Sequence, residues 1–150
     1  MKKIIIIFLI LTFTNYYKVN NVKEVSYNDE IIIEKIDLRQ NIKSYKDSDV
    51  NHNIIYLKES NFANNFYILA AHSGNSNIAY FKNLYKLKNG DEIVLNIDGN
   101  KQLYYVKKIE YINKTGTIIL PSNSKNTLYL TTCDKFNENR QLLIKCVNKT

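Results

Sequence analysis

The sequence predicts an all-β protein with a single domain. Seven or eight short apolar segments, rich in Ile, Val and Tyr, alternate with turns rich in Asn, Asp and Ser. Only one segment shows helical spacing. The chain has 150 residues, of which 45% are hydrophobic, and this is enough apolar material for one closed core. Strands spaced in this way are typical of a closed barrel or a sandwich.

The first half of the chain contains three predicted strand segments. A β-branched stretch runs from Ile31 to Leu38, and a second apolar segment covers Asn53–Leu57. The third segment, Phe66–Ala71, leads directly into His72. The composition of His72–Ser76 predicts a turn.

One helix is predicted after this turn. Apolar residues recur there at three- and four-residue spacing, which is the period of an α-helix, and the pattern stops at Asn89-Gly90. We therefore expect a helix that places one apolar face on the core. The residues of this face are Ile78, Phe81, Leu84, Tyr85 and Leu87.

The clearest hairpin lies in the second half of the chain. Glu92–Ile97 alternates between apolar and polar residues, Asp98-Gly99 is a turn dipeptide, and Leu103–Ile112 returns as the partner strand. The loop from Asn113 to Asn126 carries the only proline. A short strand is predicted inside this loop at Thr117–Leu120.

Two further strands complete the pattern. Thr127–Thr132 ends in Cys133, and Gln141–Val147 is the last strand. The loop between them carries two acidic residues, Asp134 and Glu138. Because acidic loop residues are mostly solvated, we interpret both as exposed.

The amino-terminal segment predicts export. Met1-Lys2-Lys3 precedes an apolar run from Ile4 to Leu11, and no small-x-small cleavage site follows. The run is short for a full span, which needs roughly 20 apolar residues. An uncleaved membrane anchor over residues 1–19 is the preferred interpretation, with a cleaved signal peptide or a buried first strand as alternatives. A polar tether over 20–30 and a catalytic domain over 31–150, outside the cell membrane, would follow.

The chain is basic, with a formal net charge of +7. Such a surface can attract nucleic acid, anionic lipid or an anionic cell wall. No block of five like charges occurs, so a nucleic-acid-binding tail is not indicated, although an exported basic barrel that binds nucleic acid remains an alternative. No acidic cluster indicates a calcium site, and we expect no metal or other cofactor.

Three residues near strand ends suit acyl-transfer chemistry. A thiol attacks carbonyls as its thiolate, so it needs a neighbour that relays a proton, and the intermediate needs a donor for its oxyanion. His72 follows one strand, Cys133 ends another, and Arg140 stands seven residues after Cys133. Taken singly, each is a weak signal. A disulfide between Cys133 and Cys146 is an alternative for an exported chain.

Four motifs in order resemble those of the sortase family. The resemblance covers residues 31–147, most of the chain, and keeps the family's order of His, Cys and Arg. Leu130-Thr131-Thr132-Cys133 followed by Arg140 resembles the Leu-x-Thr-Cys … Arg signature of sortases. The other three motifs are Ala70-Ala71-His72-Ser73-Gly74, then Phe81 … Leu84 … Leu87 … Gly90-Asp91-Glu92-Ile93, and finally Tyr104-Tyr105-Val106.

The resemblance implies a fold and a reaction. The fold is a closed eight-stranded β-barrel with one or two short helices. The reaction is that of a cysteine transpeptidase, in which Cys133 cleaves a sorting motif of the Leu-Pro-x-Thr-Gly kind and forms a thioacyl intermediate. His72 would act as general acid and base, and Arg140 would hold the oxyanion. Thr132 and Ala71 would line the substrate groove.

The resemblance also implies partners. These are secreted proteins that carry a sorting signal, and an amine acceptor from a cell-wall precursor or a pilin lysine. The membrane is a further partner through the amino-terminal segment. A catalytically silent barrel that binds envelope peptides is the alternative within the same family.

Overall fold

The computed structural model describes residues 28–118, 120–121 and 124–148. The predicted anchor over residues 1–19 lies outside the described residues, and the predicted tether over 20–30 is described only from residue 28. Within the described part of the chain, no helix is long and apolar enough to cross a membrane. The anchor therefore stays a prediction.

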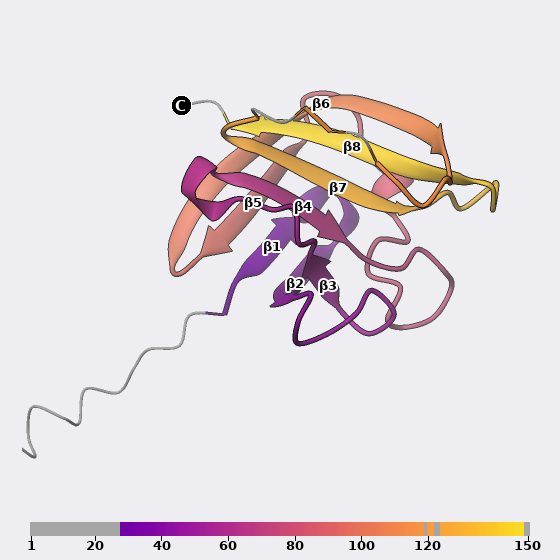
Figure 1. The fold of residues 1–150 in the computed structure, drawn as a ribbon, viewed down its shortest axis with the longest axis horizontal. Coiled ribbons are helices and arrows are strands. Elements are labelled where there is room, and N and C mark those ends of the chain that lie inside the picture. Colours follow the sequence, from indigo (N-terminus) through magenta and orange to yellow (C-terminus); the bar gives the residue numbers. More distant parts are fainter. Residues whose placement is uncertain (1–27, 119, 122–123, 149–150) are drawn as a thin grey trace, which may run out of the picture.

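Eight strands close into a barrel, which confirms the predicted fold class and decides between barrel and sandwich (Figure 1). The order around the barrel is β1-β2-β3-β4-β7-β8-β6-β5, and β5 pairs back with β1 to close it. The strands are β1 (Glu30–Ile33), β2 (Leu38–Ser44), β3 (Ile54–Tyr56), β4 (Phe66–Ala70), β5 (Glu92–Ile97), β6 (Asn100–Asn113), β7 (Thr127–Cys133) and β8 (Arg140–Asn148).

The pairing of β4 with β7 positions the site. These two strands run parallel, as do β2 and β3, whereas the other neighbours in the barrel are antiparallel. The register places Ala70 beside Thr131. Because parallel strands end at the same edge of a sheet, the residues that follow Ala70 and Thr131 emerge together at one rim of the barrel.

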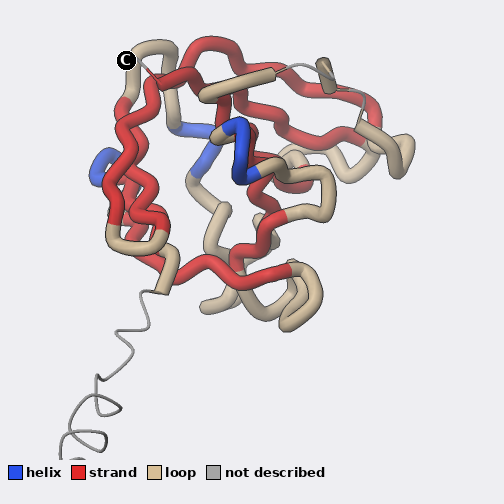
Figure 2. The backbone as a smooth tube through the Cα atoms, turned by 60° about the vertical axis from the view of Figure 1, so that its left-hand side comes forward, coloured by secondary structure: helices blue, strands red, loops and turns tan. Residues whose placement is uncertain are grey.

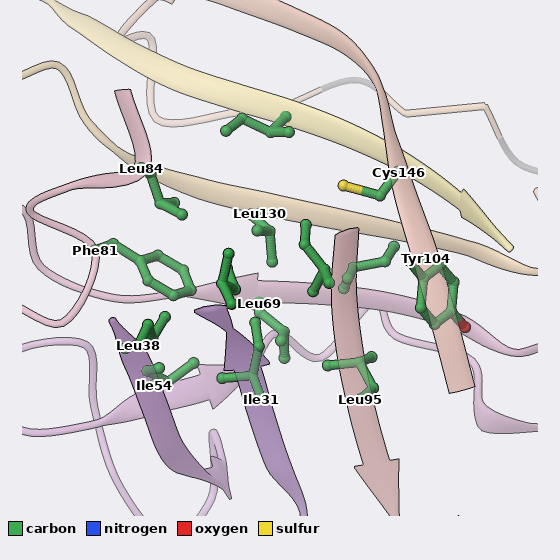
Figure 3. Close-up of a cluster of buried hydrophobic side chains, with 14 of the residues drawn as sticks. Ile31, Leu38, Ile54, Leu69, Phe81, Leu84, Leu95, Tyr104, Leu130 and Cys146 are labelled. Carbon is green, nitrogen blue, oxygen red and sulfur yellow. The ribbon is translucent and has the colours of Figure 1, made fainter. Parts of the chain in front are cut away.

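A continuous apolar core fills the barrel (Figure 3). Strand β5 shows how the sequence builds it, because Ile93, Leu95 and Ile97 are buried while the residues between them are partly exposed. Each such side chain stabilises the fold by roughly 1.5–3 kcal/mol when buried. Cys146 belongs to this core, as Figure 3 shows.

A second apolar cluster covers the outer face of β4, β7 and β8. Part of it comes from the connection between β6 and β7, which lies over these strands. Strand β4 is therefore buried along its whole length, and this explains why its sequence is a continuous apolar run instead of an alternating one. The buried members of this outer cluster are Phe66, Ile68, Tyr129 and Leu143, and the partly buried ones are Leu57, Ile112, Ile118 and Leu120.

The prediction of an α-helix over 78–87 is wrong. The N–H of Phe81 donates to the carbonyl of His72 at 3.1 Å, far beyond the four-residue reach of an α-helix. Phe81 and Leu84 still enter the core, but from successive turns. The helices among the described residues are three single-turn 3₁₀ helices, seen as short blue segments in Figure 2: η1 (Glu34–Ile36), η2 (Phe62–Asn64) and η3 (Leu84–Lys86).

The predicted hairpin is confirmed. Ile97 pairs with Asn100 across a two-residue turn, and both turn residues have positive φ, 50° at Asp98 and 79° at Gly99. Only a turn of this kind matches the twist of the flanking strands, and Asp-Gly adopts it readily. The described residues of the predicted strand at Thr117–Leu120 form no strand.

Candidate active site

A groove of about 820 Å³ lies along the outer face of β4 and β7. Residues of the connection between β6 and β7 line it, and so do residues around η2. Cys133 and His72 both line this groove. The apolar part of the lining includes Leu57, Ile68, Ile118, Leu120 and Pro121.

Cys133 lies at the end of β7 and is a partly exposed residue with a free thiol. The sequence predicts this residue as a nucleophile, and its place in the groove gives the thiol access to a ligand. A buried thiol would lack such access, so the position of Cys133 is compatible with the role of a nucleophile.

Cys146 is different, because it has no exposed surface and burial raises the pKa of its thiol. Cys146 pairs with Leu128 on β7, about five strand residues or roughly 17 Å from Cys133. That separation is far beyond the reach of a disulfide, and both cysteines are free. The disulfide alternative is therefore wrong.

His72 follows β4 at the same rim of the barrel. Its backbone N–H donates to the carbonyl of Val50 at 3.2 Å, and its own carbonyl accepts from Phe81. Its side chain is exposed and packs over Gly74, where a Cβ atom would lie 2.6 Å from the ring Nε2. The parallel register of β4 and β7 thus brings His72 and Cys133, distant in the sequence, to one groove.

Ala71 and Thr132 lie between the two strand ends. The Thr132 hydroxyl donates to the Ala71 carbonyl at 2.7 Å, so this hydroxyl ties β4 to β7. Both residues are almost fully buried and both line the groove. Both residues therefore form part of the groove lining, and the Thr132 hydroxyl is already used within the protein.

Arg140 opens β8 beside the groove, but its guanidinium is not among the groove-lining groups of the described residues. Its Nη2 and Nε donate to Asp134 Oδ2 at 2.8 and 3.0 Å. The guanidinium carbon also lies 5.2 Å from the centre of the Tyr111 ring. Arg140 thus lies on β8, the strand beside β7, which carries Cys133. The Nε and Nη2 groups of its guanidinium bind Asp134.

The interpretation of Asp134 as a solvated loop residue is wrong. Its side chain is 0% exposed because it folds back under Arg140, whereas Glu138 is exposed as predicted. Sequence reasoning also gave no role to Gly74 or Tyr111. Opposite charges at the two ends of one short loop, Asp134 and Arg140, were the available signal for the ion pair.

In the part of the chain that the structure describes, no group of three or more His, Cys, Asp or Glu side chains is arranged to hold a metal ion. The expectation that the protein needs no metal stays a prediction.

Comparisons with known proteins agree with this fold. A family model, described as the sortase domain, matches residues 31–148. No curated protein matches the sequence significantly.

Several solved structures share the fold. Sortase A from Corynebacterium diphtheriae has a TM-score of 0.71 and 23% identity, over 82% of this chain and 60% of that one. Sortase C1 from Streptococcus agalactiae has a TM-score of 0.68 and 22% identity, over 86% and 71%. Sortase C2 of Group B Streptococcus Pilus Island 1 has a TM-score of 0.70 and 20% identity, over 85% and 77%. The chain thus spans three-fifths of the first of these proteins, and identities this low show the fold alone.

The family model is more specific than the structural likeness, because it matches most of the chain, including His72, Cys133 and Arg140. On that match, the chain belongs to the sortase family.

Proposed function

We propose that this protein is an active cysteine transpeptidase that cleaves a sorting motif in secreted proteins. The observation that carries the proposal is that Cys133 and His72 line one open groove, at the ends of two paired strands. A thiol and an imidazole in one groove support acyl transfer, since one attacks and the other relays a proton.

The proposed reaction has two steps. Cys133 attacks the carbonyl of the scissile peptide bond as a thiolate, the C–N bond breaks, and His72 gives a proton to the leaving amine. An incoming amine then attacks the thioester and loses its proton to His72, and the sulfur leaves as a thiolate. Arg140 donates hydrogen bonds to the oxyanion of each tetrahedral intermediate.

The lining of the groove supports a substrate with an apolar residue upstream of the cut. Leu57, Ile68, Ile118 and Leu120 offer an apolar surface that an aliphatic side chain can cover. A motif of the Leu-Pro-x-Thr-Gly kind fits such a surface. Ala71 and Thr132 would contact the peptide near the cut, as small groups in the lining of the groove.

The proposal includes a location and partners. The domain would act outside the cell, attached to the membrane by residues 1–19, on secreted proteins with a carboxyl-terminal sorting signal. The amine would come from a cell-wall precursor or a pilin lysine.

A peptide library tests the function. We expect the full chain to form a thioacyl adduct with at least one peptide of a Leu-Pro-x-Thr-Gly-type library, detected by mass. Cys133→Ala should abolish adduct, cleavage and transfer, whereas Cys146→Ala should leave them nearly intact.

Two results would contradict the proposal. If no peptide forms an adduct, the result supports the alternative of a catalytically silent barrel that binds envelope peptides. If the chain instead shifts single-stranded DNA in a gel at moderate salt, the nucleic-acid alternative gains support.

A further inference from the structure

Arg140 is held by a carboxylate that directly follows the candidate nucleophile. Asp134 is the next residue after Cys133, and its Oδ2 accepts hydrogen bonds from both Nε and Nη2 of Arg140. The Asp134 side chain is 0% exposed and that of Arg140 is 42% exposed. A buried carboxylate with a guanidinium partner is a fixed element, because separating the two would leave the carboxylate buried without a partner.

Asp134 is itself held by the loop between β7 and β8. Its Oδ1 accepts from the backbone N–H of Phe136 at 2.9 Å, and its backbone N–H donates to the carbonyl of Arg140 at 3.0 Å. Both carboxylate oxygens and the backbone N–H are therefore engaged. The carboxylate cannot rotate without losing a hydrogen bond.

Tyr111 restrains Arg140 from a third strand. Tyr111 lies on β6 and pairs with Leu142 on β8, and its ring centre is 5.2 Å from the Arg140 guanidinium carbon. A cation over an aromatic face is attracted by the ring, by about 0.5–1 kcal/mol at an exposed site. The Asp134 carboxylate fixes one edge of the Arg140 guanidinium, and the Tyr111 ring packs against the guanidinium.

This arrangement leaves the opposite edge of the guanidinium unused. Asp134 takes the edge formed by Nε and Nη2, and no residue that the structure describes accepts a hydrogen bond from Nη1, so its N–H groups can bind another acceptor. Arg140 precedes Gln141, which pairs directly with Cys133 and lines the groove. A guanidinium held in one plane at the first residue of β8 is a preorganised donor, and preorganised donors act on an oxyanion without reorganising.

We propose that Asp134 and Tyr111 are positioning residues that fix the plane of Arg140 for the transfer reaction. The inference rests on the proposed function and adds two residues to it. The competing interpretation is that Asp134 is a competitor, which holds Arg140 away from the substrate until a peptide displaces it. The two interpretations predict opposite effects on rate when the carboxylate is neutralised.

Asp134→Asn is the first test. An amide has one acceptor oxygen and no charge, so it cannot accept from both Arg140 and the Phe136 N–H. The variant therefore loses the ion pair and one of the two anchors that fix the guanidinium plane. We expect kcat to fall about tenfold or more while KM changes about twofold or less. The assay uses the full chain, the best-cleaved peptide of the Leu-Pro-x-Thr-Gly library, and hydroxylamine as the amine.

Two substitutions at Tyr111 form a matched pair of variants, and this test does not depend on whether Asp134→Asn folds stably. Tyr111 is 42% exposed, so its substitution leaves the barrel core intact. Tyr111→Phe keeps the ring and should keep kcat near the original value. Tyr111→Leu removes the ring and should lower kcat several-fold at unchanged KM.

The outcomes separate this inference from the proposed function. Adduct formation that survives Cys133→Ala would overturn the proposed function itself. If Cys133→Ala is inactive but Asp134→Asn matches or exceeds the kcat of the unmodified chain, only the positioning role is overturned. Equal kcat values in Tyr111→Phe and Tyr111→Leu would overturn the role of Tyr111.

Discussion

The imidazole of His72 lies directly against Gly74. A Cβ atom at residue 74 would approach the ring Nε2 to 2.6 Å, which is closer than packed atoms allow, and Cδ2 to 3.1 Å, which is a tight contact. A side chain at this position would therefore require the imidazole to move. The atoms that would have to move belong to an exposed side chain, and the barrel is not touched.

Gly74→Ala should consequently displace the imidazole without unfolding the protein. We expect kcat to fall about tenfold or more, because a general base that moves by about 1 Å loses its alignment with the proton. Thermal unfolding should change little. The measurement is kcat as a function of pH beside a melting curve, with Asn75→Ala, an exposed position in the same turn, as the control. Full activity in Gly74→Ala would show that the ring position does not matter.

The turn before β5 depends on one carboxylate. Asp91 Oδ2 accepts from the Lys88 backbone N–H at 2.6 Å, and Oδ1 accepts from Lys35 Nζ at 2.8 Å. Its carbonyl also accepts from the Val106 N–H at 2.9 Å. Asp91 therefore joins η1, the turn and β6. Burial raises the pKa of Asp91, but the Lys35 ammonium and the Lys88 N–H outweigh it, so the pKa lies below its ordinary value.

This lowered pKa predicts how the stability of the turn depends on pH. A carboxyl with a lowered pKa in the folded protein stabilises it above the unfolded pKa of about 3.9, and this contribution is lost as the pH falls through the folded pKa. Asp91→Asn should therefore lower the free energy of unfolding by about 1 kcal/mol at pH 7. The difference between the two proteins should shrink below about pH 4.

Urea unfolding of Asp91→Asn at several pH values measures this difference. Asp47→Asn, at an exposed carboxylate between β2 and β3, is the control and should change little at any pH. A difference that stays constant between pH 7 and pH 3 would mean that the charge of Asp91 is not involved.

The molecule has two apolar clusters with separate tasks. The interior of the barrel holds fully buried residues such as Leu130, whereas the outer cluster holds Ile118, which is partly buried and lines the groove. The interior, which holds most of the fully buried side chains, therefore contributes the larger part of the stability. The outer cluster shapes the surface on which a peptide would lie.

Matched truncations should separate these tasks. Leu130→Ala should lower the free energy of unfolding by about 2–5 kcal/mol, because it leaves a cavity in a closed core. Ile118→Ala should cost much less and should instead raise KM for the library peptide, since it removes apolar surface from the groove. Urea unfolding and steady-state kinetics on both variants are the measurements. If the two variants lose similar free energies of unfolding and Ile118→Ala leaves KM unchanged, the two clusters do not have separate tasks.

Local patterns predicted most of the strands but not all of them. The segment Ile31–Leu38 was predicted as one stretch, whereas the structure divides it among β1, η1 and the start of β2, and the predicted α-helix is absent from the described residues. The Asp98-Gly99 turn and the alternation of β5 specify a hairpin within about twenty residues, so that element could be predicted from neighbours alone. The stripe over 78–87 has the period of a helix, but the bond from Phe81 to His72 keeps the segment as successive turns. A tertiary contact overrode the local preference there.

The candidate site also has a part that the sequence predicts and a part that only the tertiary structure determines. His72, Cys133 and Arg140 could be selected from motifs, because each stands at a strand end beside short sequence signatures. Their arrangement could not, since it depends on the parallel register that sets Ala70 beside Thr131, between segments 61 residues apart. Such a register follows from packing on both faces of β4 and β7, which no local pattern encodes. The burial of Asp134 beneath Arg140 was also decided by the tertiary structure alone. The charge and spacing of loop residues do not reveal which side chains lose contact with water.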